Sequence, residues 1–161
     1  MTADTKTHSP ATTTLRHATI VLERRLKASP ARAFKAWADG AERAKWDVPG
    51  KDWVVAEHSQ DFRVGGEEQT RFGPKGAANI LSKGRYLDIV PDRRIISAGV
   101  MHADEIAMTA TLCTVEFAPD GAGTKLTLTD QSCFFGWETE EMRHGGFNEI
   151  LDKLQSYLAQ H

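Results

Sequence analysis

The sequence contains little cysteine and no grouped metal-binding side chains. Cys113 and Cys133 are its two cysteines, and they lie outside any CxxC motif. This arrangement favours free thiols in a reducing compartment over a disulfide or a redox pair. The six histidines form no HxH, HExxH or His–Cys cluster, so neither a metal site nor a cofactor is predicted.

Long apolar runs and a strong charge of either sign are also absent. No segment approaches the roughly 20 apolar residues of a membrane span, and the first residues lack the basic-then-apolar order of a secretion signal. A formal net charge of -2 and a pI near 6.3 give no electrostatic basis for binding nucleic acid. The sequence therefore predicts a cytoplasmic protein that neither inserts into membranes nor binds nucleic acid.

The length of 161 residues is enough for one domain with one core, and too short for two ordinary domains. Residues 1–15 are rich in Thr, with Ala, Ser and Pro, and carry almost no apolar side chains. A segment of this composition is predicted to be a disordered tail. The predicted domain spans residues 16–161.

The first part of this domain predicts one strand and two short helices. Residues 17–26 are rich in β-branched side chains with partial alternation, which indicates a strand. Ser29 provides an N-cap and Pro30 a first helical residue for a short helix, which Asp39-Gly40 interrupts. A second short helix is predicted over residues 41–46.

The middle of the chain predicts a series of strands joined by short turns. The short connections favour antiparallel pairing throughout. Gly84 is the predicted kink in one long strand, and residues 118–123 are predicted to form a hairpin loop. The predicted strands span residues 53–58, 67–72, 78–90, 94–102, 107–117 and 124–129.

The last segment predicts a long amphipathic helix. Thr139 is its expected N-cap, and the two glutamates that follow suit the positive end of the helix dipole. Gly145 and Gly146 lie within this helix, and Gly146 falls on its apolar stripe. The missing side chain at Gly146 either lets the helix approach the sheet or leaves room for a guest molecule. The apolar stripe consists of Phe147, Ile150, Leu151, Leu154, Tyr157 and Leu158.

Several short motifs follow one another in an order that is typical of one superfamily. With these motifs the chain resembles the START-like (SRPBCC) superfamily over residues 18–158. Within it, the chain is similar to the branch named for the C-terminal domain of the activator of the heat-shock-protein-90 ATPase. The motifs are Ala28-Ser29-Pro30 followed by Phe34 and Trp37, Asp61-x-Arg63-x-Gly65-Gly66, Gly84-x-Tyr86-x-x-Ile89-x-Pro91-x-Arg93 and Gly146-x-x-x-Ile150-Leu151-x-x-Leu154.

The resemblance implies an α+β protein with the helix-grip fold. In this fold a curved antiparallel sheet of about six to seven strands surrounds a long C-terminal helix, and two short helices follow the first strand. Members of the superfamily bind lipids, sterols, hormones or polyketides in a cavity between sheet and helix, and some are cyclases or hydrolases. The shared motifs mark the fold, and none of them is catalytic.

A cluster of charged residues around the Gly65-Gly66 turn allows two interpretations. A histidine near carboxylates can act as a general base, but alternating strand positions place such charges on a solvated face, which we favour. Cys113 likewise is either a nucleophile in a pocket or, as we favour, a small buried hydrophobe. The charged cluster consists of Glu57, His58, Arg63, Glu67 and Glu68.

These observations lead to one principal functional hypothesis and two alternatives. The chain is expected to bind a small hydrophobic or amphipathic molecule between the sheet and the terminal helix, and a homodimer is compatible with the sequence. The alternatives are a cyclase or hydrolase that uses His58, Tyr86 or His102 as acid and base, and a chaperone-accessory or regulatory interaction protein. The predicted pocket residues are Trp46, Tyr86, His102, Cys113, Trp137 and Phe147.

Overall fold

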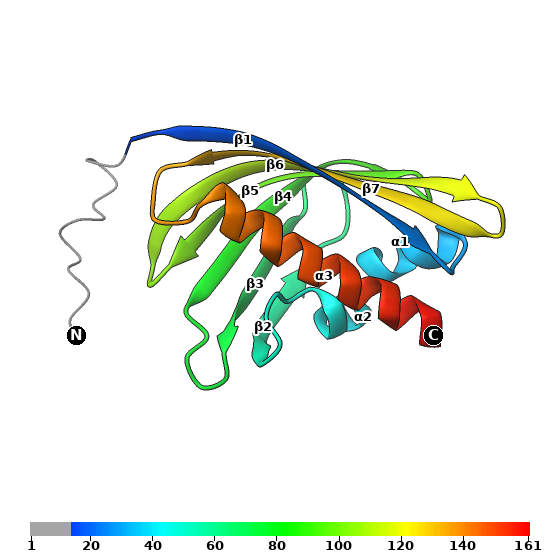
Figure 1. Ribbon diagram of the computed structural model, residues 1–161, viewed down its shortest axis with the longest axis horizontal. Helices are drawn as coiled ribbons and strands as arrows, with labels where there is room; N and C mark the ends of the chain where they lie inside the picture. Colours follow the sequence, from blue (N-terminus) through cyan, green and yellow to red (C-terminus); the bar gives the residue numbers. More distant parts are fainter. Residues whose placement is uncertain (1–13) are drawn as a thin grey trace.

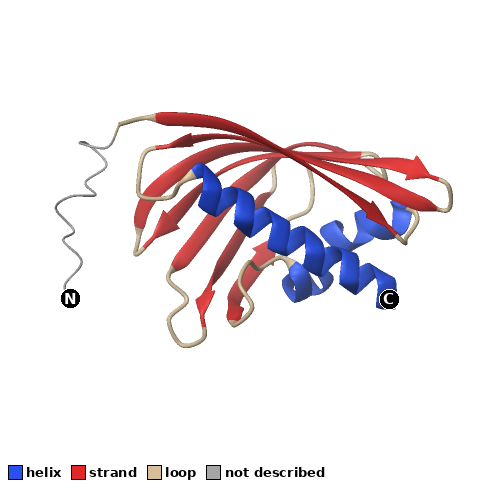
Figure 2. Cartoon of the chain, in the orientation of Figure 1, coloured by secondary structure: helices blue, strands red, loops and turns tan. Residues whose placement is uncertain are grey.

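The computed structural model describes residues 14–161 of the chain. The predicted tail over residues 1–15 therefore lies outside the described residues, except for its last two positions. The remaining chain forms one antiparallel sheet and three helices (Figures 1 and 2). The predicted α+β helix-grip fold is thereby confirmed, including the two short helices after the first strand.

The sheet has seven strands in the order β1-β7-β6-β5-β4-β3-β2, so the first strand lies beside the last one. All neighbouring strands are antiparallel. The long helix α3 lies across the concave face of this curved sheet. The short helices α1 and α2 lie near the C-terminal half of α3 (Figure 1). The elements are β1 (Arg16–Leu26), α1 (Pro30–Ala38), α2 (Gly40–Trp46), β2 (Trp53–Gln60), β3 (Glu67–Pro74), β4 (Ile80–Val90), β5 (Arg94–Ala103), β6 (Ile106–Asp120), β7 (Gly123–Phe134) and α3 (Glu140–Gln160).

Each helix begins at a side chain that accepts hydrogen bonds from the first free backbone N–H groups. Ser29 accepts from the backbone N–H of Arg32 at the start of α1, and Thr139 accepts from that of Met142 at the start of α3. Both predicted N-caps are thereby confirmed. Asp39, predicted only as a helix breaker, also serves as the N-cap of α2.

Gly84, the predicted kink of strand β4, does not carry its bulge. The register of β4 against β5 shifts between Tyr86 and Asp88, so the irregularity lies at Leu87. Gly84 instead pairs in regular register with Gly99 on β5. A side chain on Gly99 would place its Cβ 2.3 Å from the carbonyl oxygen of Lys83, so this strand pair depends on the absence of a side chain there.

The predicted hairpin loop over residues 118–123 is shorter in the structure. Strand β6 continues to Asp120 and β7 begins at Gly123, because Pro119 pairs with Thr124 within the ladder. Gly121 adopts a positive φ of 60°, which a glycine reaches without steric cost, and this allows a turn of two residues.

The core lies between the sheet and the C-terminal half of α3. Here α3 buries Ile150, Leu151, Leu154 and Leu158. These side chains belong to the same core cluster as Trp46 of α2 and the inward-facing side chains of β1, β6 and β7. The N-terminal half of α3 contributes few buried apolar side chains, so space remains between this half and the sheet.

Candidate functional site

A small chamber lies between the middle of the sheet and the N-terminal half of α3. It has a volume of about 120 Å³. Its apolar wall includes Trp37, Ile95, Val115 and Leu128. Its polar wall comprises Arg43, Asp47, Glu68, Thr70, Ser82, Lys83, Tyr86, Ser97, Thr111, Asp130 and Arg143.

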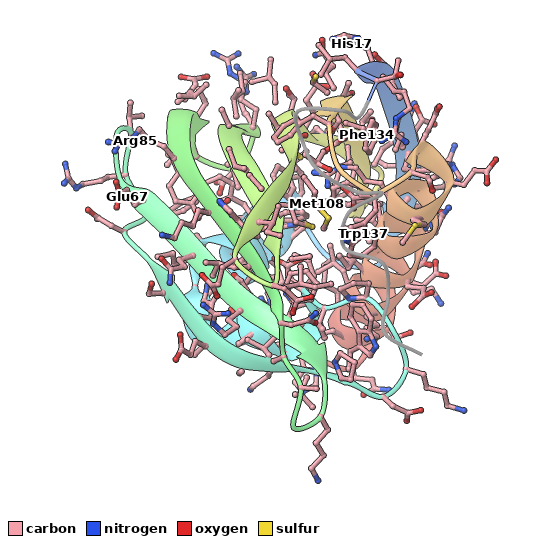
Figure 3. All side chains as sticks on the ribbon, turned by 90° about the vertical axis from the view of Figure 1, so that its left-hand side faces the viewer. His17, Glu67, Arg85, Met108, Phe134 and Trp137 are labelled. Carbon is pink, nitrogen blue, oxygen red and sulfur yellow. The ribbon has the colours of Figure 1, made fainter. Side chains whose placement is uncertain are left out.

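A larger groove of about 500 Å³ lies under the N-terminal end of α3. Figure 3 shows two of its residues, Met108 and Trp137, close to each other near this end. The groove is lined mainly by apolar side chains, among them Trp53, Phe72 and Met142. Chamber and groove are adjacent, and both are lined by Pro49, Phe72, Met101, Arg143, Phe147 and Ile150.

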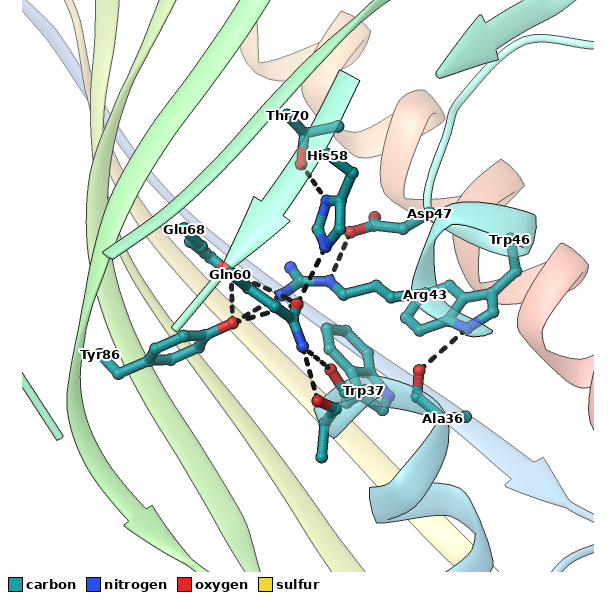
Figure 4. Close-up of polar contacts among 11 residues, drawn as sticks. Ala36, Trp37, Arg43, Trp46, Asp47, His58, Gln60, Glu68, Thr70 and Tyr86 are labelled. Atoms are coloured by element: carbon teal, nitrogen blue, oxygen red, sulfur yellow. Dashed lines mark hydrogen bonds and ion pairs between the residues drawn. The ribbon is translucent and has the colours of Figure 1, made fainter. Parts of the chain in front are cut away.

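Arg43 of α2 organises one polar side of the chamber (Figure 4). Its Nε donates to Asp47 at 2.8 Å, and its Nη1 donates to Glu68 and to the hydroxyl of Tyr86. The Tyr86 hydroxyl in turn donates to Glu68 Oε2 at 2.7 Å. Burial opposes the charge of Glu68, but the Arg43 guanidinium and the Tyr86 hydroxyl hold the pKa of this carboxyl below its ordinary value. The network therefore presents a fixed ion pair to the chamber.

The interpretation of the charged cluster as a solvated face is wrong for two of its members. Glu68 lies in the chamber wall, and His58 binds Thr70 through Nδ1 at 2.8 Å and Gln60 through Nε2 at 3.0 Å. Glu57 and Glu67 are exposed as predicted. The difference arises because adjacent residues, Glu57 and His58 on β2 and Glu67 and Glu68 on β3, face opposite sides of the sheet.

The depressed pKa of Glu68 leads to a prediction about acid stability. An acid whose pKa is lower in the folded than in the unfolded protein stabilises the fold above its unfolded pKa. That contribution is lost as the pH falls through the folded pKa. Below about pH 5, we expect the free energy of unfolding to decrease less steeply with falling pH in Glu68→Gln than in the wild-type protein. Urea unfolding monitored by circular dichroism at several pH values measures this slope.

Glu67→Gln is the matched control for this experiment, because Glu67 precedes Glu68 but is exposed and pairs with Arg85 at the surface. Its pH dependence should follow that of the wild-type protein. Equal slopes for the wild-type protein and Glu68→Gln would contradict the role assigned to the Glu68 carboxylate.

Arg143 of α3 organises the second polar side of the chamber. Its Nε and Nη2 donate to the two oxygens of Asp130 at 3.0 and 3.2 Å, and its Nη1 donates to Glu138 Oε1 at 3.1 Å. Asp130 is completely buried on β7 and also accepts from Thr111 and Ser132. This group of Asp130, Glu138 and Arg143, the buried triad, ties the start of α3 to the sheet.

Cys113 lies in the chamber wall together with residues of both polar networks. Burial, reinforced by the negative charge of Asp130, raises the pKa of its thiol to about 12. The thiol therefore stays protonated at neutral pH, and a protonated thiol is a poor nucleophile. This supports its interpretation as a small hydrophobic side chain, which packs partly buried against the core.

The structure places four of the six predicted pocket residues at the chamber or the groove. Tyr86 and Cys113 line the chamber, Phe147 lines both chamber and groove, and Trp137 lines the groove with 41% of its surface exposed. Trp46 belongs to the core, where its Nε1 donates to the carbonyl of Ala36. His102 lines neither space and instead contributes to a shallow depression with Arg85 and Val100.

The acid–base candidates of the enzyme hypothesis do not converge. Tyr86 lines the chamber, His58 is engaged with Thr70 and Gln60, and His102 lies away from both. The tyrosine meets a carboxylate, Glu68, but this carboxylate is already paired with Arg43. The hydrogen bonds fix the orientation of Arg43, Glu68 and Tyr86. None of the histidines within residues 14–161 lines the chamber.

Sequence reasoning missed Arg43, Asp130 and Arg143 of the polar wall and Glu138 of the groove. Two of these carried a usable signal. Asp130 continues the inward alternation of Leu126 and Leu128 on β7. Arg143 lies four residues before Phe147, on the same side of α3 as its apolar stripe. A charge at a core-facing position is a recognisable candidate for a buried ion pair.

Residues 27–159 match the family described as "Activator of Hsp90 ATPase homolog 1-like protein". The chain belongs to this family, AHSA1. The family is part of the START-like (SRPBCC) superfamily that the sequence motifs indicated. The match covers all the elements that build the chamber and the groove.

Solved structures of related proteins share this fold. A protein of Rhizobium loti is 39% identical, with 90% of this chain and 99% of that chain covered and a TM-score of 0.80. A protein of Rhizobium leguminosarum is 34% identical, with coverages of 92% and 98% and a TM-score of 0.83. The AHSA1 protein of Silicibacter pomeroyi is 23% identical, with coverages of 89% and 100% and a TM-score of 0.74, which shows the common fold alone.

A search of curated proteins finds no match to this AHSA1 chain. None of the helices within residues 14–161 is long and apolar enough to cross a bilayer. The same part of the chain contains no group of three or more His, Cys, Asp or Glu side chains placed to hold a metal ion.

Proposed function

We propose that this AHSA1 protein binds a small amphipathic molecule non-covalently in the groove and chamber. The observation that carries the proposal is an apolar groove that lies directly beside a chamber with two fixed ion-pair networks and shares lining residues with it. Ligand sites typically combine about 300–1,000 Å³ of mostly apolar wall with a few oriented polar groups. The groove has the required volume, and the chamber supplies the polar groups.

The glycine pair of α3 supports an open groove. Gly145 and Gly146 both line it. A Cβ on Gly145 would meet no atom within 4 Å, and one on Gly146 would only touch Pro49 at 3.6 Å, an ordinary contact. Close approach of α3 to the sheet therefore does not require glycine here. The absent side chains leave free volume in the groove. Each glycine also destabilises the helix by about 1 kcal/mol relative to alanine.

Filling this volume is expected to abolish binding without harming the fold. Gly146→Leu places a branched apolar side chain at the edge of the groove, so we expect at least about a tenfold loss of affinity for the neutral dye Nile red, since its volume competes with that of the guest. Fluorescence titration measures the affinity, and native mass spectrometry of the protein as isolated shows whether a guest is already bound.

Gly146→Ala is the matched control, because it shares the gain in helix propensity but adds one methyl group. It should bind the dye like the wild-type protein, and its unfolding free energy should rise by about 1 kcal/mol. The proposal is wrong if the wild-type protein binds no dye and carries no guest, or if Gly146→Leu binds as tightly as Gly146→Ala.

A further inference from the structure

The loop between α2 and β2 forms part of the wall of the groove. It runs beside α3 (Figure 1), and its residues 48–50 are called the strap below. Pro49 and Gly50 of the strap line the groove, and Pro49 also lines the chamber. The strap therefore borders both spaces.

Two side chains of α3 hold the strap in place. Lys153 Nζ donates to the carbonyl oxygens of Val48 at 2.6 Å and of Gly50 at 2.8 Å. Glu149 Oε2 accepts from the backbone N–H of Gly50. Glu149 and Lys153, the latch, lie four residues apart and so point to the same side of α3. Because each hydrogen bond of this kind contributes only modestly to stability in water, the latch can open without unfolding the domain.

The strap packs on a small hydrophobic cluster that is separate from the main core. Val48 is buried there with Phe72 and Ile80, and Trp53 packs against them. Three of these residues, Trp53, Phe72 and Ile80, line the groove. The apolar stripe of α3 belongs to the main core instead. The two sides of the groove therefore have separate packing, and each can persist when the sides move apart.

The strap touches both sides of the groove. Gly50 has a positive φ of 86°, and a Cβ at this position would lie 2.8 Å from Cγ of Trp53. The backbone of Gly50 is thus seated against the indole ring. On the other side, a Cβ at Gly146 of α3 would lie 3.6 Å from the Cβ of Pro49. The strap in this position closes the gap between Trp53 and α3.

We propose that the strap opens to admit a ligand to the groove and closes over it again, with Glu149 and Lys153 as its latch. This proposal rests on the proposed function, because it assigns the control of access to the same site. The latch holds the strap closed in the empty and in the occupied protein alike. It therefore sets the rates of ligand entry and release rather than the affinity.

A reversible cross-link tests whether the strap has to move. The 3.6 Å between the Cβ positions of residues 49 and 146 falls within the range of about 3.5–4.5 Å found in disulfides. The double variant Pro49→Cys and Gly146→Cys is made with Cys113→Ala and Cys133→Ala, so that no other thiol competes. Oxidation then locks the strap to α3, and dithiothreitol releases it.

We expect oxidation of this variant to slow both association and dissociation of Nile red at least about tenfold, because the locked strap can no longer open. Stopped-flow fluorescence measures both rates, and mass spectrometry after alkylation verifies the cross-link. The reduced form of the same protein is the matched control, and its rates should return to those measured before oxidation.

Lys153→Met tests the latch without a cross-link, and it replaces the double variant if that protein does not fold or does not oxidise. The substitution keeps most of the side-chain length but removes both hydrogen bonds to the strap. We expect association and dissociation of Nile red to become about fivefold faster, with a change in Kd below about twofold. Lys51→Met is the matched control, since Lys51 is exposed beside the strap and lines neither space.

The outcomes separate this proposal from the proposed function. Equal dye rates in the oxidised and reduced double variant overturn the opening of the strap, while ligand binding itself stands. Rates in Lys153→Met that equal those of Lys51→Met, or a weaker affinity at unchanged association rate, overturn the latch. Absence of dye binding by the wild-type protein overturns the strap proposal and the proposed function together.

Discussion

Arg143→Met is expected to lower the free energy of unfolding by about 3–5 kcal/mol, because it leaves the carboxylates of the buried triad without their cation. Asp130 is fully buried and cannot recruit water in place of the guanidinium. Urea unfolding monitored by circular dichroism at pH 7 measures the change.

Arg25→Met is the control for loss of an arginine at an ion pair. Arg25 also binds an aspartate, Asp120, but its side chain is 78% exposed, so we expect a change below about 1 kcal/mol. A second variant tests the cause. Replacing Asp130 by leucine and Glu138 by glutamine in the Arg143→Met background should restore part of the stability, because no buried charge is then stranded. A loss below about 1 kcal/mol for Arg143→Met would contradict this account.

Trp46→Ala is expected to have an effect of similar size, about 3–5 kcal/mol, through loss of core packing. No part of the Trp46 surface is exposed, and its ring packs edge-to-face against Trp37 with centroids 4.7 Å apart. The substitution also removes the hydrogen bond to Ala36 and leaves a cavity beneath α1. Thermal and urea unfolding measure the loss.

Trp137→Ala is the complementary variant, since this tryptophan is half-exposed at the groove. It should lower the free energy of unfolding by less than about 1 kcal/mol but weaken the binding of Nile red. Trp46→Phe, in contrast, should leave dye binding unchanged. If Trp46→Phe weakened dye binding more than Trp137→Ala, the assignment of Trp46 to the core and Trp137 to the groove would be wrong.

The fold was predictable because its signals are local. Caps such as Ser29 and Thr139, alternating strands and the apolar stripe of α3 depend on residues close in sequence. The register shift in β4 shows where this fails, because it lies between Tyr86 and Asp88 and no local signal marks it. Gly84 resembles a bulge position, but its pairing with Gly99 on β5 keeps the strand regular, and that partner is set by the sheet register.

The site was predictable only in part, because it depends on which side chains from distant elements meet. Tyr86, Cys113, Trp137 and Phe147 were placed at the chamber or groove by their position in the fold. Trp46 and Trp137 are both tryptophans, and the sequence alone does not tell which of them is buried. The packing of α2 against α1 buries Trp46. The pairing of Glu138 with Arg143 follows from the turn before α3, for which the sequence has no periodic signal.

The pairing of β1 with β7 also has a consequence for biosynthesis. Residues 16–26 find their neighbours at residues 124–134, so this strand pair closes a loop that contains most of the chain. A nascent chain on the ribosome therefore holds β1 without its partner until β7 has been translated, and α3 follows only after that. We therefore expect the complete sheet to form only after β7 has been translated, since pairing of strands distant in sequence is slow.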